Sequence, residues 1–242
     1  MLQRRLRHAL DGLFALPATL GVHRLQAILL LAVFCGGAWA FAELADDVTE
    51  GETREIDEML LLALRNPADR TDMLGPGWIE ETGRDFTALG GIGVLTFIVL
   101  ATLGYLCISR RFRTALFIAI AVTGGQLLTT LLKHGFDRPR PDLVPHEVIV
   151  QTASFPSGHS MMAAVTYFTL AALLVRLDLP RRVKLYLLLV AVLVTVLVGA
   201  SRVYLGVHWP TDVIAGWLAG AAWAAFCWLA AQWLERRRAA RS

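Results

Sequence analysis

Long apolar runs separated by short polar segments dominate this sequence. A helix needs about 20 mostly apolar residues to cross a bilayer, within a range of about 17 to 25. Six runs meet or nearly meet this length, and the two shortest can each be extended by a flanking turn. The pattern therefore predicts an all-α fold, a polytopic membrane helix bundle with six transmembrane helices: Leu25–Leu44, Ala88–Ile108, Thr114–Leu132, His159–Val175, Val183–Ala200 and Val213–Leu234.

The segment between the first two runs, residues 45–87, is acidic and has a pattern of its own. The apolar positions of Ile56–Arg65 favour a short amphipathic helix that lies at the membrane surface or covers the spans. Asn66–Gly77 is rich in turn-forming residues. No repeat or composition shift divides the chain, so we expect residues 1–242 to form a single membrane-embedded domain.

Composition agrees with a membrane protein. Hydrophobic residues make up 56% of the chain, charged residues make up 18%, and the mean hydropathy is +0.55. These values exclude a disordered chain, a disulfide-stapled secreted module and a nucleic-acid-binding arm. The three cysteines, Cys35, Cys107 and Cys227, fall within spans and are interpreted as small packing residues.

The distribution of charge predicts the orientation of the spans. With six spans, both termini share a side with the segments around residues 109–113 and 176–184, and 15 of the 23 Lys and Arg residues but only three of the 20 acidic residues lie there. Because Lys and Arg accumulate on the cytoplasmic side, we expect cytoplasmic termini. Segments 45–87, 133–158 and 201–212 then face outside. The alternative, a signal peptide cleaved near Ala38–Ala40, would leave the other five spans in the same orientation.

Three polar clusters lie where the outer segments meet spans, and all three fall on the same face. They contain cations, three histidines and a Pro-Ser-Gly turn at the start of an apolar helix. Segments that meet at one membrane surface can together build one site. The clusters are Lys133–Pro141, Ser154–Ser160 and Ser201–Asp212.

The residue types in these clusters suit phosphate chemistry. Lys133, Arg140 and Arg202 are cations, and arginine contacts phosphate oxygens in a bidentate manner. Pro156-Ser157-Gly158 opens a helix, so its backbone N–H groups can bind an anion with the helix dipole behind them. No carboxylate cluster for Mg²⁺ lies nearby, so we expect catalysis without a metal or another cofactor.

Two of these histidines complete a reaction in which one attacks phosphorus and the other protonates the leaving oxygen. Asp212 follows His208 at i+4, and a carboxylate on one ring nitrogen leaves the other as a free lone pair. His208 is therefore the expected nucleophile and Asp212 its orienting partner. His159 has no carboxylate in its own cluster and is the expected general acid.

Taken in order, the motifs Lys133-x6-Arg140-Pro141, Pro156-Ser157-Gly158-His159 and Ser201-Arg202-x5-His208-x3-Asp212 resemble the three-part signature of the type 2 phosphatidic acid phosphatase superfamily. The resemblance implies a phosphohistidine on His208, oriented by Asp212, with His159 acting as acid and later as base. It also implies a set of phosphate-binding residues, of which spacing alone gives no role to Ser201: Lys133, Arg140, Ser157, Gly158, Ser201 and Arg202.

The resemblance also bears on substrate and location. It implies a membrane lipid substrate, with polyprenyl diphosphate, phosphatidate, phosphatidylglycerol phosphate and lipid A phosphate as candidates. Together with the charge pattern, it predicts an enzyme in a phospholipid bilayer, the bacterial inner membrane, with a periplasmic active site. Transfer of the phosphate to a second lipid instead of water is the alternative. A transporter is a third possibility, but it would need ionisable groups deep within the spans, where this sequence has almost none.

Other residues have less specific interpretations. Arg138 competes with Arg140 as the Arg-Pro arginine, and the spacing leaves it as a rim cation or a partner of Asp137. His134 and His146 are interpreted as exposed loop residues. Five tryptophans are expected at the membrane interface or against lipid: Trp209, Trp217, Trp223, Trp228 and Trp233.

Overall fold

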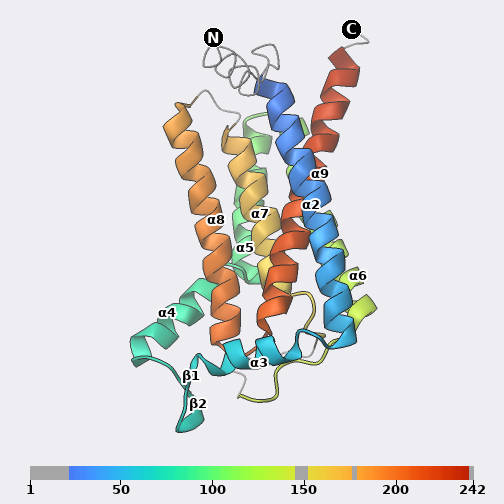
Figure 1. The fold of residues 1–242 in the computed structure, drawn as a ribbon. Coiled ribbons are helices and arrows are strands. Elements are labelled where there is room, and N and C mark those ends of the chain that lie inside the picture. Colours follow the sequence, from blue (N-terminus) through green and yellow to red (C-terminus); the bar gives the residue numbers. More distant parts are fainter. Residues whose placement is uncertain (1–21, 145–151, 176–178, 240–242) are drawn as a thin grey trace, which may run out of the picture.

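The fold is known from a computed structural model that describes residues 22–144, 152–175 and 179–239. The N-terminal leader and His146 lie outside these residues. Within them, helices account for almost all regular structure, with one short β-hairpin (Figure 1). The elements are α2 (Val22–Glu50), α3 (Arg54–Leu62), β1 (Arg65–Asn66), β2 (Asp69–Met73), α4 (Gly77–Ala88), α5 (Ile92–Ile108), α6 (Phe112–Phe136), α7 (Gly158–Val175), α8 (Arg181–Tyr204) and α9 (Pro210–Ala239).

Six long helices form the bundle, which confirms the predicted all-α class and is consistent with five to six membrane spans. Five of them, α2, α6, α7, α8 and α9, are by themselves long and apolar enough to cross a membrane. The sixth, α5, qualifies together with α4, from which it is bent by 45°. Figure 1 shows the six running side by side, with the start of α2 and the end of α9 at the same end of the bundle.

Helix α7 lies at the centre and packs against α6, α8 and α9. Small residues make the contact with α9 possible. A Cβ atom added at Gly216 would lie 2.7 Å from the Ser157 carbonyl oxygen, and one at Gly220 would lie 2.6 Å from that of Met161. Helices in lipid associate through such close packing, because burial from water provides no driving force there. The two glycines therefore fix how closely α9 approaches the start of α7.

Two of the five tryptophans correct the expectation that they lie at the membrane interface or against lipid, because Trp209 and Trp228 are buried. The indole nitrogens of Trp217 and Trp223 donate to the carbonyls of Thr195 and Ala121 on neighbouring helices, at 3.0 and 2.8 Å. An indole N–H within a bundle needs such a partner, and a helix carbonyl supplies it. The exposed Trp233, which lies 3.8 Å from the Arg237 guanidinium, suits the interface.

The outer segment between α2 and α5 contains more structure than its sequence pattern indicates. The predicted amphipathic helix is confirmed as α3, which crosses the end of the bundle (Figure 1). The turn-rich stretch forms the antiparallel pair β1–β2. Helix α4 was not predicted, because its polar composition resembles a loop. It packs on α8, where Gly83 contacts the ring of Tyr204.

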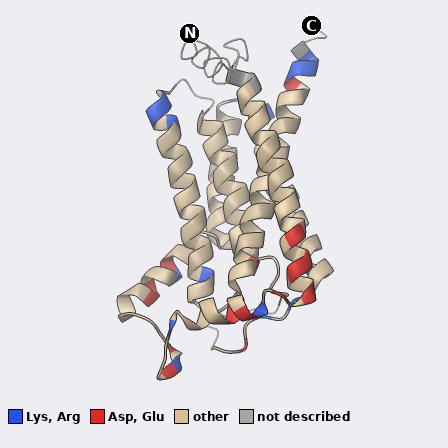
Figure 2. Cartoon of the chain, in the orientation of Figure 1, with Lys and Arg blue, Asp and Glu red and all other residues tan. Residues whose placement is uncertain are grey.

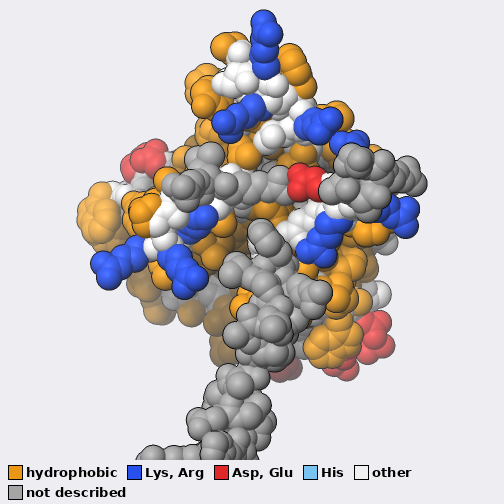
Figure 3. All heavy atoms as spheres, turned by 90° about the horizontal axis from the view of Figure 1, so that it is seen from above, with side chains coloured by type: hydrophobic (Ala, Val, Ile, Leu, Met, Phe, Trp, Pro, Cys, Tyr) orange, Lys and Arg blue, Asp and Glu red, His pale blue; other side chains and the backbone are white. Residues whose placement is uncertain are grey.

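Charged residues divide between the two ends of the bundle (Figure 2). Acidic residues gather at the end that carries α3, α4 and the hairpin. At the opposite end, seen directly in Figure 3, the charged side chains of the described residues are mainly Lys and Arg, among hydrophobic ones. The fold thus keeps apart the two populations of charge that the sequence analysis assigned to opposite membrane faces.

The close contact between α7 and α9 leads to a prediction about stability. Gly220→Ala should lower the thermal unfolding temperature in detergent, because its methyl group would collide with backbone; overpacking of this kind costs about 1–3 kcal/mol. Gly104→Ala on α5 is the matched control, since no atom lies within 4 Å of the added Cβ. Equal unfolding temperatures for the two variants would contradict the packing argument.

Candidate active site

The three polar clusters meet at the acidic end of the bundle, around one cavity of about 1030 Å³. The cavity is lined by α5, α6, the start of α7, the last turn of α8 and the segments that lead away from α6 and into α9. Six of the residues singled out from the sequence line it together: Lys133, Arg140, Gly158, His159, Arg202 and His208. Sequence positions up to 75 residues apart thus form one site.

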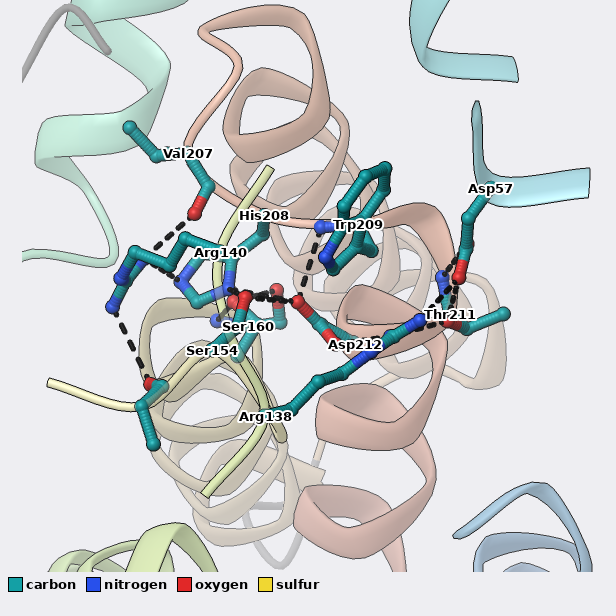
Figure 4. A network of polar contacts seen from close by, with 12 residues as sticks. Asp57, Arg138, Arg140, Ser154, Ser160, Val207, His208, Trp209, Thr211 and Asp212 are labelled. Carbon is teal, nitrogen blue, oxygen red and sulfur yellow. Dashed lines mark hydrogen bonds and ion pairs between the residues drawn. The ribbon is translucent and has the colours of Figure 1, made fainter. Parts of the chain in front are cut away.

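His208 lies on the bend that precedes α9 and is almost completely buried. Its Nδ1 faces Asp212 Oδ2 at 3.3 Å, and its Nε2 lies 3.1 Å from Arg140 Nη1 (Figure 4). An arginine can only donate, so Nε2 accepts and Nδ1 carries the proton. The contacts therefore hold His208 in the tautomer whose lone pair lies on Nε2, next to the cationic Arg140.

The surroundings of His208 also keep its ring neutral. Burial lowers the pKa of His208 well below its ordinary value, while the hydrogen bond and charge of Asp212 act in the opposite direction. Arg140 and Arg202 lower this pKa further through their positive charges. A neutral imidazole with a free lone pair is the form that can attack an electrophile.

Asp212 is fully buried, and its carboxylate accepts hydrogen bonds from several segments. Arg138 Nη1 donates to Oδ1 at 2.6 Å, and the backbone N–H of Trp209 donates to Oδ2 at 3.0 Å. The Ser154 hydroxyl donates to Oδ2 as well and lies 3.3 Å from His208 Nδ1. These donors compensate the buried charge and fix the direction of the carboxylate toward His208.

The cations of the cavity are held by other parts of the fold. Arg140 donates to the carbonyls of Val207 and Thr152 at 2.6 and 2.9 Å. Arg202 is 2% exposed, and its Nη1 donates to the Thr87 hydroxyl of α4 at 2.9 Å. Its Nε has no hydrogen-bond partner within the described parts of the chain. A buried guanidinium with an unused donor beside a cavity is suited to receive an anion.

At the start of α7, Gly158 and His159 line the cavity and Ser157 does not. Gly158 faces Lys133, since an added Cβ would lie 3.4 Å from Lys133 Cε, and His159 follows it along the cavity wall. Ser157 is fully buried behind them. Its hydroxyl accepts a bond of 2.9 Å from the Ser160 hydroxyl, and its N–H donates to the Asp212 carbonyl at 2.9 Å. Ser157 thus joins α7 to α9 instead of lining the cavity.

Ser201 also lies away from the cavity lining. It is buried, and its hydroxyl donates to the Val198 carbonyl of its own helix at 2.7 Å. His134 differs from its interpretation as a loop residue: it is exposed, but it belongs to α6 and lines the cavity.

Arg138 corrects its interpretation as a rim cation or partner of Asp137. Its guanidinium is directed inward and pairs with two buried carboxylates, Asp212 at 2.6 Å and Asp57 at 2.8 Å. Sequence reasoning gave no role to Asp57, and it placed Ser154 in a polar cluster without giving it a role. A signal for Asp57 was present, because it lies one turn before Leu61 on the buried face of an amphipathic helix, where a carboxylate needs a partner.

Comparison with known proteins places the chain among membrane phosphatases. Residues 113–236 match the sequence profile of the PAP2 superfamily. The phosphatidylglycerophosphatase B of Bacillus subtilis is 36% identical over 146 residues, which are 59% of this chain and 70% of that protein. The undecaprenyl-diphosphatase of Sulfolobus acidocaldarius is 42% identical over 73 residues, 30% of this chain and 31% of that protein.

A solved structure agrees with these sequence relatives. The crystal structure of a transmembrane PAP2-type phosphatidylglycerolphosphate phosphatase from Bacillus subtilis superposes with a TM-score of 0.71 at 29% sequence identity. The match covers 81% of this chain and 94% of the other. The likeness therefore includes the membrane-spanning bundle as well as the three polar motifs.

The geometry of Arg202 predicts that the cavity binds an inorganic anion. Orthophosphate or vanadate should raise the unfolding temperature of the wild-type protein, since a ligand at 100 times its Kd adds about 2.7 kcal/mol. Arg202→Ala should remove most of this rise. Arg84→Ala on α4, whose partners are the surface residues Glu80 and Glu81, should keep it. An unchanged rise in Arg202→Ala would show that the anion binds elsewhere.

Proposed function

This chain belongs to the PAP2 superfamily, and on that basis we propose that it hydrolyses a phosphomonoester or diphosphate of a membrane lipid through a phosphohistidine on His208. Its relatives bear the names of lipid phosphatases, including phosphatidylglycerophosphatase B and undecaprenyl-diphosphatase. The observation that carries the proposal is the cavity, which combines a cationic end with a long apolar wall.

The cationic end suits a phosphate group. Lys133, Arg140 and Arg202 approach it from three different segments. Phosphoryl transfer depends on neutralising the oxygens around phosphorus and on holding the attacking and leaving groups in line. Fixed cations supply the first requirement without a metal ion, and the only carboxylate of the described lining is Asp137.

The reaction then proceeds in two balanced steps. His208 Nε2 attacks phosphorus, and the bond to the leaving oxygen breaks while His159 supplies a proton to that oxygen. In the second step His159 takes a proton from water, the hydroxide oxygen bonds to phosphorus and the P–N bond breaks. Asp212 stabilises the positive charge that the His208 ring carries between the steps.

Substrate binding requires Arg140 to change partner. Arg140 Nη1 lies 3.1 Å from His208 Nε2 and donates to its lone pair, which the attack on phosphorus needs. A phosphate oxygen is a stronger acceptor for a guanidinium than a neutral ring nitrogen is. We therefore infer that the phosphate itself draws Arg140 away and so uncovers the nucleophile.

The apolar wall suits a lipid tail. It is formed by α5 and α6, and the side chains of α5 that line it extend from Ile92 to Leu103. Eleven helical steps of about 1.5 Å give a depth of about 16 Å, half of a hydrocarbon core of about 30 Å. A tail of this reach would come from one leaflet. We propose that this leaflet is the periplasmic one of a bacterial inner membrane, with both termini cytoplasmic; the accumulation of Lys and Arg at the other end of the bundle supports this orientation.

The histidine roles are tested by substitution. His208→Ala and His159→Ala should each lower phosphate release from a dispersed phosphorylated lipid by at least about 10³-fold, as removal of a catalytic group does in other covalent enzymes. Assays in excess EDTA should leave the wild-type rate unchanged. His134→Ala, an exposed residue of the same cavity, is the control. Wild-type rates in both histidine variants would refute the mechanism, and phosphate recovered on a second lipid would favour the transferase.

The tail site is tested by filling the cavity. Leu100→Trp places a bulky ring on the apolar wall and narrows the space for a tail, so kcat/KM should fall about 10-fold or more for a long-chain lipid phosphate. It should change little for a short, water-soluble phosphate ester. Phe97→Trp, on the same helix but away from the cavity lining, should act as wild type on both. Equal losses for both substrates would contradict a tail site between α5 and α6.

A further inference from the structure

Asp57 is a fully buried carboxylate on an otherwise amphipathic surface helix, α3. One oxygen, Oδ1, accepts the backbone N–H of Thr211 at 2.9 Å. The other, Oδ2, accepts the Thr211 hydroxyl at 2.6 Å and Arg138 Nη2 at 2.8 Å. Asp57 does not line the cavity, so it has no contact with a bound phosphate. Its contacts instead join α3 to the first turn of α9, where Asp212 lies.

Arg138 forms a bridge between Asp57 and Asp212 (Figure 4). Nη1 donates to Asp212 Oδ1 at 2.6 Å and to the Thr211 hydroxyl at 2.9 Å, while Nη2 turns to Asp57. The guanidinium also lies 5.6 Å from the centre of the Trp209 ring, which restricts its position. One planar cation therefore serves two carboxylates that are both 0% exposed.

The balance of charge in this group bears on His208. If Arg138 faced Asp212 alone, the pair would be neutral and would do little to stabilise a positive imidazole ring. With Asp57 present, two carboxylates share one guanidinium, and one negative charge remains. That charge is buried beside His208, where medium of low dielectric strengthens its effect. The ring becomes positive when its Nε2 bonds to phosphorus.

We propose that Asp57 is a positioning residue for phosphoryl transfer, which balances Arg138 and holds the start of α9 so that Asp212 keeps both its direction and its negative charge toward His208. This inference rests on the proposed function. It gives the outer segment 45–87 a part in the reaction: α3 must be docked on the bundle for the nucleophile to be fully active.

The test is the charge-removing substitution Asp57→Asn. An asparagine has nearly the same shape, its oxygen can still accept the Thr211 N–H, and Arg138 and Asp212 remain as a neutral pair. We expect kcat to fall by about 10- to 100-fold, the range found when a residue that orients a metal-ligating side chain through a hydrogen bond is replaced. KM should stay within about 2-fold, because the residue is outside the cavity. Glu58→Gln, next to it on α3 and paired only with the exposed Arg54, should keep the wild-type kcat and KM.

A second variant, Arg138→Lys, keeps the charge but lacks the planar fork that reaches both carboxylates. It should also lower kcat and leave KM unchanged. The double variant should lose less than the product of the two single losses, because both substitutions act through Asp212. If Asp57→Asn does not purify as folded protein, the kcat and KM of Arg138→Lys, compared with those of the wild type, test the positioning role instead.

The outcomes separate this inference from the proposed function. A wild-type kcat in folded Asp57→Asn, or a loss that appears in KM instead of kcat, would overturn the positioning role while wild-type lipid phosphatase activity stands. Wild-type protein that releases no phosphate from any phosphorylated lipid would instead refute the proposed function itself.

Discussion

The burial of the Asp212 carboxylate is the constraint on which the rest of this site depends. A carboxylate without solvent is tolerated only when charged and hydrogen-bonding partners surround it. Those partners are the side chains of Arg138, Ser154 and His208 and the backbone N–H of Trp209. They come from the segment between α6 and α7 and from the segment between α8 and α9. To satisfy this one charge, the chain must bring together the segment after α6, the approach to α7 and the start of α9. The same contacts leave His208 neutral, oriented and beside the cavity.

Around this centre the protein separates two kinds of environment. Cations and polar backbone gather at the acidic end of the bundle, and the apolar side chains of α5 and α6 continue the cavity into the membrane-spanning region. A phosphorylated lipid has the same division, with a charged head at the interface and an apolar tail in the hydrocarbon. The helices α3 and α4 contribute from outside the bundle, since α4 holds Arg202 through Thr87 and α3 holds Arg138 through Asp57. The acidic outer segment is thus part of the support of the site.

Much of this arrangement could be predicted from the sequence. Six apolar runs predicted the spans, and the three polar motifs identified six residues that line the cavity. Apart from Asp212 beside His208, the partners of these side chains could not be predicted. Arg138 lies 81 positions from Asp57 and 74 from Asp212, and no local pattern distinguishes an arginine that turns inward from one that faces water. Tryptophan is a residue type typical of interface anchors, yet the indole nitrogens of Trp217 and Trp223 donate to carbonyls of neighbouring helices. Helix α4 was not predicted, because its many charged residues are typical of a loop.

The sequence by itself determined the features that depend on local order: the length of each apolar run, the end of the bundle at which cations accumulate, and the i+4 spacing that sets Asp212 beside His208. These follow from helix geometry and from the cost of placing charge in hydrocarbon, which act over a few residues. Only the tertiary structure decided that Arg138, which the spacing left as a rim cation, turns inward and joins two buried carboxylates. The inward position of Arg138 depends on the docking of α3 against α9. Because this contact joins distant segments, its energy cannot be read from either segment alone.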